Sequence, residues 1–213
     1  MLHLIMQGRV NEALLLLIAI VISLSFHEFG HAWTAKKFGD NTAERMGRLT
    51  LNPVAHIDLM GLLMVAVIGF GYAKPVPTDP RNFNSPKASL WISAAGPGMN
   101  LILAIIFVNL WVASYQYDFG LFSQAGAQFF MQYMAFINLL LMLFNLLPIG
   151  PLDGHYILPY FLPRDLAYKY VQWNAHYGTM ALFGFIALSM LGVPVFSFLM
   201  GVAGSLASLL VII

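Results

Sequence analysis

Two histidines and a glutamate lie close together in an otherwise apolar stretch near the N-terminus. His27, Glu28 and His31 occupy the segment SLSFHEFGHAW, which follows an uncharged run over residues 13–26. On a helix, His27 and His31 would share one face, one turn apart, so both imidazoles could reach a single ion. Glu28 would be placed to accept a proton from an attacking water. The H-E-x-x-H spacing therefore predicts a zinc site with an adjacent general base.

The apolar surroundings favour a bound cation as the explanation of these three polar side chains. An ionised glutamate deep in hydrocarbon costs several kcal/mol unless something compensates it. A divalent zinc would stabilise the nearby carboxylate and bind the imidazoles. The alternative is a hydrogen-bonding cluster between helices, since H-E-x-x-H also occurs by chance and each buried polar group needs a partner.

A third protein ligand is expected, because catalytic zinc sites usually combine three protein ligands with one open position. Asp153, in FNLLPIGPLDGHY, is the only acidic residue between residues 119 and 164. Prolines and glycines around it break a helix, and the freed backbone groups are tolerated only where protein or a water-filled cavity satisfies them. Such a break would turn the carboxylate inward. The alternative is that Asp153 caps a short helix beginning near His155.

The composition predicts a membrane protein. Of the 213 residues, 60% are hydrophobic and only 9% are charged, too few to cover a soluble globule. The net charge of +1 excludes nucleic-acid binding by bulk electrostatics. The chain has no cysteine, so histidine and carboxylate side chains must hold any metal.

Apolar runs long enough to cross about 30 Å of hydrocarbon divide the chain. They cover residues 10–36, 88–117, 119–152 and 170–213, and Gly192-Val193-Pro194 splits the last into two pieces. A connector at 37–87 contains a short apolar segment, 59–70, which we expect to be re-entrant or interfacial. The prediction is an all-α polytopic membrane protein with four or five crossings, or a bundle of about five to six membrane helices with this segment included.

The basic residues predict the orientation. Seven of the ten Lys and Arg residues fall at 36–87, whereas the loop at 116–125 has none and carries Asp118. By the positive-inside rule the connector is cytoplasmic and the Asp118 loop lies outside. His27 precedes Lys37 by ten residues, about 15 Å along a helix. We therefore expect a multi-pass protein of the cell membrane with its active site near the cytoplasmic side.

Two motifs together resemble a known family. HEFGH at 27–31 and NLLPIGPLDG at 145–154 are similar to the H-E-x-x-H and N-x-x-P-x-x-x-L-D-G motifs of the site-2 protease family of intramembrane zinc metallopeptidases. The stretches GRLTLNPVAHID, GYAKPVPTDPRNF and AAGPGMN are similar to those of small bacterial members, which lack the PDZ and CBS domains of larger relatives. The resemblance covers roughly residues 20–160.

The resemblance assigns a role to each candidate site residue. It implies that His27, His31 and Asp153 bind one zinc ion per chain and that Glu28 is the catalytic base. It also implies that Asn145 holds the substrate carbonyl or stabilises the oxyanion, where an amide donor is worth about 3 kcal/mol. An interhelical hydrogen bond is the alternative for Asn145.

The implied function is hydrolysis of peptide bonds within transmembrane segments of membrane proteins or signal-peptide remnants. The partners would be a transmembrane protein substrate and the lipid bilayer; no feature of the sequence predicts an oligomeric state. Two alternatives are a catalytically silent relative that binds membrane helices and a metal transporter with further His or Asp sites along several spans. We expect a single membrane-embedded peptidase domain over 1–213, with a core at 10–160 and C-terminal helices at 170–213.

Three further polar residues receive secondary predictions. His56 is expected to make a hydrogen bond within the connector, or else to line a route to the site. Asn100 follows small residues that permit close helix contact, and we expect packing, with support of the site as the alternative. His155 replaces a small residue found in many relatives, and we expect an interfacial side chain or a partner of the site.

Overall fold

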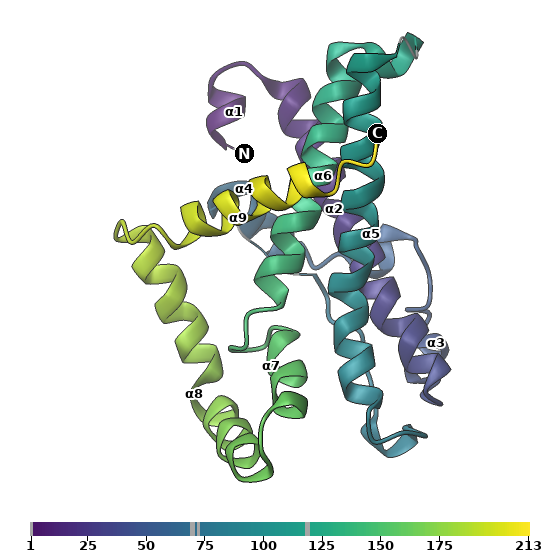
Figure 1. Cartoon of the computed structure of the whole chain (residues 1–213), viewed down its shortest axis with the longest axis vertical. Helices are drawn as coiled ribbons and strands as arrows, with labels where there is room; N and C mark the ends of the chain where they lie inside the picture. The colour runs from purple at the N-terminus through teal and green to yellow at the C-terminus, as the bar shows by residue number, and fades with distance from the viewer. Residues whose placement is uncertain (1, 69–70, 72, 118–119) are drawn as a thin grey trace.

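Three long helices, α2, α5 and α6, pack against one another and form the centre of the molecule (Figure 1). The computed structural model describes residues 2–68, 71, 73–117 and 120–213, and the regular structure within them is helical. The helices are α1 (Leu2–Met6), α2 (Val10–Lys37), α3 (Thr42–Arg45), α4 (Leu59–Ile68), α5 (Ala88–Gln116), α6 (Ala125–Asn145), α7 (Gly154–Ile157), α8 (Arg164–Met190) and α9 (Val195–Leu209). Short 3-10 turns are η1 (Pro53–Ala55), η2 (Pro80–Asn82), η3 (Gly120–Ser123) and η4 (Leu158–Phe161).

The predicted fold class, an all-α polytopic membrane protein, is confirmed. Helices α2, α5 and α6 are long and apolar enough to cross a membrane, and each lies on a predicted span. Helices α8 and α9 occupy the predicted C-terminal region and are separated near Gly192. Neither of them is among the three helices long and apolar enough to cross a membrane. Helix α4 covers most of the short apolar segment. Residues 69–70 of that segment and Asp118 lie outside the described residues.

Small residues let α2 and α5 approach closely. A Cβ atom added at Gly30 would lie 2.7 Å from the Met99 side chain and 2.8 Å from Ala95 O, so only glycine fits there without displacing α5. Further along the contact, Ala19, Leu103 and Met134 form a buried cluster that joins α2, α5 and α6. The site residues on α2 are therefore held between two neighbouring helices.

The last helix closes the bundle on one side. In Figure 1, α9 crosses α6 and leads to a C-terminus beside α5. Ala203 and Ala207 of α9 pack on a buried cluster of α5 and α6 side chains. Asn109 of α5 then binds the chain end, donating from Nδ2 to Leu210 O and accepting at Oδ1 from the Ile212 N–H.

The segment after α6 turns back toward α2 because α8 holds it. Gly150 has φ of 66°, a conformation that favours glycine. Asn174 of α8 accepts from the Gly150 N–H at 3.1 Å and donates to Gly150 O at 3.3 Å. The Tyr170 hydroxyl donates to Pro148 O. These contacts fix the broken segment that delivers Asp153.

Asp40 anchors the connector to the end of α2. Its buried carboxylate accepts hydrogen bonds from the N–H and hydroxyl of Thr42, the Asp79 N–H and the Asn82 amide. Burial raises the pKa of Asp40, but these hydrogen bonds outweigh it and hold the pKa below the ordinary value. The carboxylate thus stays ionised and ties the segment at residues 79–82 to α2.

Candidate metal centre

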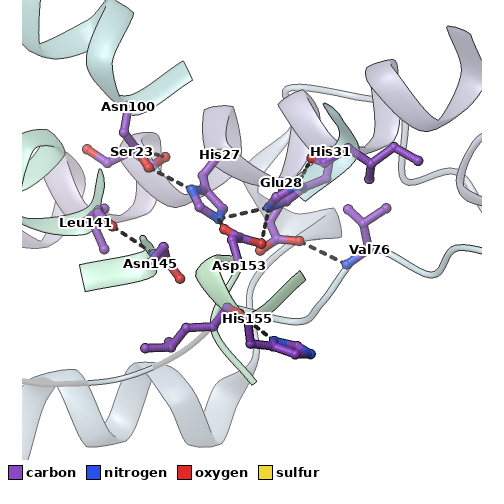
Figure 2. A network of polar contacts seen from close by, with 12 residues as sticks. Ser23, His27, Glu28, His31, Val76, Asn100, Leu141, Asn145, Asp153 and His155 are labelled. Atoms are coloured by element: carbon purple, nitrogen blue, oxygen red, sulfur yellow. Dashed lines mark hydrogen bonds and ion pairs between the residues drawn. The ribbon is translucent and has the colours of Figure 1, made fainter. Parts of the chain in front are cut away.

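The structure brings the three predicted metal ligands together. His27 Nε2 lies 3.0 Å from His31 Nε2 and 3.2 Å from Asp153 Oδ2, and His31 Nε2 lies 3.3 Å from Asp153 Oδ1. The two histidines come from one face of α2, and Asp153 comes from the turn before α7 (Figure 2). Their exposed fractions are 5% for His27 and 9% for His31. Three candidate ligand atoms thus converge at a site with little exposure to solvent.

The spacing of these atoms fits a zinc ion. Tetrahedral zinc with ligand bonds of about 2.0–2.1 Å separates its ligand atoms by about 3.3–3.4 Å, close to the distances observed. Asp153 Oδ2 is buried and has no hydrogen-bond partner. Protein atoms alone therefore do not satisfy the hydrogen-bonding capacity of this carboxylate. Within the described residues, this is the one group of three or more His, Asp or Glu side chains able to share an ion.

Asn100 sets the tautomer of His27. The amide nitrogens form a chain in which Asn100 Nδ2 donates to Asn138 Oδ1, and Asn138 Nδ2 donates to Ser23 Oγ. This leaves Asn100 Oδ1 as the acceptor facing His27 Nδ1 at 2.7 Å. His27 must therefore carry its proton on Nδ1, and its Nε2 presents a lone pair to the ligand cluster.

His31 is oriented in the same way by the backbone of α5. Its Nδ1 lies 2.7 Å from Ile92 O, an acceptor, so the proton sits on Nδ1. When both rings are neutral, the two Nε2 atoms present lone pairs to the same place, 3.0 Å apart. A cation at that place would attract both lone pairs, so the arrangement suits a metal ion.

Gly96 forms a wall of the centre. A Cβ atom added at Gly96 would lie 2.3 Å from His31 Nε2 and 2.6 Å from His27 Cε1. A side chain at this position would occupy the space beside the ligand atoms. Glycine at residue 96 is therefore required by the site itself and not only by helix packing.

Glu28 lies beside the cluster and is held by the connector. Its exposed fraction is 8%, and Oε2 accepts a 2.9 Å hydrogen bond from the Val76 N–H. Figure 2 shows this contact next to the ligand atoms. The carboxylate is thus held beside the ligand cluster by a backbone donor.

Asn145 is not part of the ligand cluster. It ends α6, and its Nδ2 donates to Leu141 O at 2.9 Å within its own helix. An amide nitrogen has two N–H groups, so one remains for another acceptor. The predicted role in oxyanion binding stays a prediction.

The structure also shows the contacts of the three polar residues that received secondary predictions. Asn100 contacts His27, which favours the alternative prediction for this residue, support of the site. Its sequence signal was an amide in the middle of an apolar span. His56 makes its hydrogen bonds within the connector, as predicted. His155 bonds Leu152 O and contacts the Tyr156 ring. No sequence signal pointed to Ile92 O, because a backbone carbonyl leaves no trace in residue types.

A polytopic helical fold in which two histidines and an aspartate could share a metal ion, with a glutamate beside them, is the arrangement of a membrane-embedded metalloprotease. The chain belongs to peptidase family M50, the site-2 protease family, which it matches over residues 15–118 and 112–190. It is 42% identical over 165 residues to the candidate zinc metalloprotease YwhC of Bacillus subtilis (strain 168), covering 76% of this chain and 75% of that protein.

More distant relatives carry related names. The candidate zinc metalloprotease Rip2 of Mycolicibacterium smegmatis is 33% identical over 151 residues, which cover 68% of this chain and 56% of that protein. Zinc metalloprotease MJ0392 of Methanocaldococcus jannaschii is 25% identical over 182 residues, covering 83% of this chain and 44% of that protein. No solved structure matches the chain. All three relatives are named as zinc metalloproteases.

Proposed function

We propose that this metalloprotease hydrolyses peptide bonds within transmembrane segments of other membrane proteins or within signal-peptide remnants. The observation that carries the proposal is the position of the ligand cluster. His27 and His31 lie in the second half of α2, a 28-residue helix that is apolar enough to cross a membrane. A peptide bond that reaches these residues must therefore enter the membrane region of the protein.

The proposed metal site is His27, His31 and Asp153, with one zinc ion per chain. The bound ion would act as a Lewis acid that polarises the peptide carbonyl, and it would lower the pKa of a bound water to about 7. The Nδ1 hydrogen bonds of the histidines direct their Nε2 lone pairs toward this position. A neutral imidazole pair and one carboxylate leave a fourth tetrahedral position for the reacting groups.

Glu28 is the proposed general base. It accepts a proton from the attacking water and passes it to the leaving amine. The Val76 N–H holds its carboxylate at the edge of the ligand cluster. Asn145 is the proposed donor to the oxyanion, through the amide N–H that Leu141 O does not use.

The substrate must change shape before it can react. A regular helix uses its carbonyls in its own hydrogen bonds, so the cleaved segment has to unwind locally. Lys36 and Lys37 follow His27 within about 15 Å of helix, and this supports a reaction near the cytoplasmic side of the cell membrane.

The assignment of Glu28 gives the functional test. Wild-type protein in lipid vesicles should cleave a labelled single-span membrane protein, and Glu28→Gln should lower the rate at least about 100-fold while keeping its zinc, because only the proton acceptor is lost. Glu44→Gln is the matched control, since Glu44 is an exposed carboxylate paired with Lys36. Cleavage by Glu28→Gln at a rate near that of wild type would exclude Glu28 as the base.

A further inference from the structure

Arg48 is a buried cation in the connector between α2 and α5. Its exposed fraction is 5%, and no carboxylate among the described residues lies within ion-pair distance of it. The guanidinium instead donates to two consecutive backbone carbonyls, Lys74 O and Pro75 O. Burial of a charge without a counter-charge is costly. The arginine therefore serves to hold this stretch of backbone.

His56 completes the hold on the same backbone. Its Nε2–H donates to Thr50 O at 2.8 Å, which leaves Nδ1 as an acceptor 3.5 Å from Arg48 Nη2. Its own carbonyl accepts from the Lys74 N–H at 2.9 Å. His56 is 1% exposed. We refer to Arg48 and His56 as the Arg48–His56 clamp.

The clamp ends one residue before the contact with the proposed base. Arg48 binds the carbonyls of residues 74 and 75, and the next N–H, that of Val76, donates to Glu28 Oε2. Figure 2 shows the Val76 N–H directed at Glu28. The position of this N–H is thus set by two contacts that involve neither the metal ligands nor the helices that carry them.

We propose that the Arg48–His56 clamp positions the Val76 N–H so that it holds the Glu28 carboxylate ready for proton transfer. Arg48, His56 and Val76 are positioning residues in this view, because they act through Glu28. Proton transfer is sensitive to the placement of the base, and small displacements lower the rate without weakening substrate binding. The inference rests on the proposed role of Glu28.

Two pairs of variants test the clamp in full-length protein in lipid vesicles. Arg48→Met removes the guanidinium, and Arg45→Met removes an exposed charge from the same connector. Val76→Pro deletes the N–H that binds Glu28 in a segment that already has prolines at 75 and 77. Thr78→Pro deletes an N–H that makes no hydrogen bond within the described residues.

We expect Arg48→Met and Val76→Pro to lower kcat about tenfold or more, with KM within about twofold of wild type and zinc content unchanged. The two controls should keep the wild-type kcat. Arg48→Lys should recover part of the rate, since a lysine can donate to one carbonyl but not to two in a fixed fork.

Three results would overturn the inference: a wild-type kcat in Arg48→Met or in Val76→Pro, an effect confined to KM, or equal losses in these variants and their controls. If Arg48→Met does not fold, Arg48→Lys takes its place, and a wild-type kcat in Arg48→Lys together with a loss in Val76→Pro would overturn the role of the fork. Cleavage by Glu28→Gln at a rate near that of wild type would remove the role of Glu28 on which the inference rests, whereas no cleavage by wild type would refute the proposed function, so the failures are distinguishable.

Discussion

Neighbouring groups fix both imidazoles of the centre with their Nδ1 protons turned away from the ligand cluster. Asn100 Oδ1 and Ile92 O accept these protons, so each Nε2 points its lone pair at the same place. Residue types and spacing predicted His27, His31 and Asp153 as candidates. The link from His27 to Asn100 spans 73 positions and depends on which helices touch, so spacing could not predict it.

Asn100 supplies a residue-scale prediction. Asn100→Ala should weaken zinc binding about 10–100-fold, because His27 loses the acceptor that holds its ring and tautomer. Asn109→Ala is the matched control, since Asn109 lies on the same helix and binds Leu210 O and the Ile212 N–H. Competition with a chelator measures the affinity. Equal affinities of Asn100→Ala and wild type would show that the Asn100 contact does not support the site.

Gly96 supplies the second residue-scale prediction. Gly96→Ala should remove most of the bound zinc, because the new Cβ would lie 2.3 Å from His31 Nε2. Gly98→Ala adds the same atom on the same helix where nothing lies within 4 Å, and it should keep its zinc. Metal analysis of the two purified variants makes the comparison. A full complement of zinc in Gly96→Ala would mean that α5 does not pass so close to the ligand atoms.

At the scale of elements, the segments that bring Asp153 and Val76 to α2 are irregular. Gly150 and its bonds to Asn174 shape the turn before Asp153, and Asp40 shapes the connector. Apolar runs predicted the spans because membrane helices need about 20 such residues. The same pattern could not place the connector, whose conformation depends on hydrogen bonds between residues far apart in the chain.

Asp40 gives a pH-dependent prediction for this scale. Because hydrogen bonds lower its pKa in the folded protein, its contribution to stability is full above the ordinary value of 3.8 and is lost as the pH falls through the lowered value. Asp40→Asn should therefore unfold at a lower temperature than wild type near neutral pH, and the gap should narrow below about pH 4. Thermal unfolding in detergent across this range measures the gap. A gap independent of pH would contradict the role of the ionised carboxylate.

At the scale of the whole molecule, the site exists only where two helices, α2 and α5, meet the two irregular segments that carry Asp153 and Val76. Helix α2 carries His27, Glu28 and His31, α5 contributes Gly96 and the backbone beside it, and the segment after α6 carries Asp153. Composition and apolar runs predicted the class and most of the helices. They could not predict that α9 crosses α6, since that contact depends on alanines that look the same on any apolar helix.

Zinc analysis of the purified protein and of Asp153→Ala, with Glu28→Gln as the control, decides whether the three side chains hold the metal. We expect one zinc ion per chain in wild type and in Glu28→Gln, and a large loss in Asp153→Ala, because two imidazoles alone leave the tetrahedral site short of a ligand. Zinc retained in full by Asp153→Ala, or absent from carefully purified wild type supplied with the ion, would contradict the proposed metal centre.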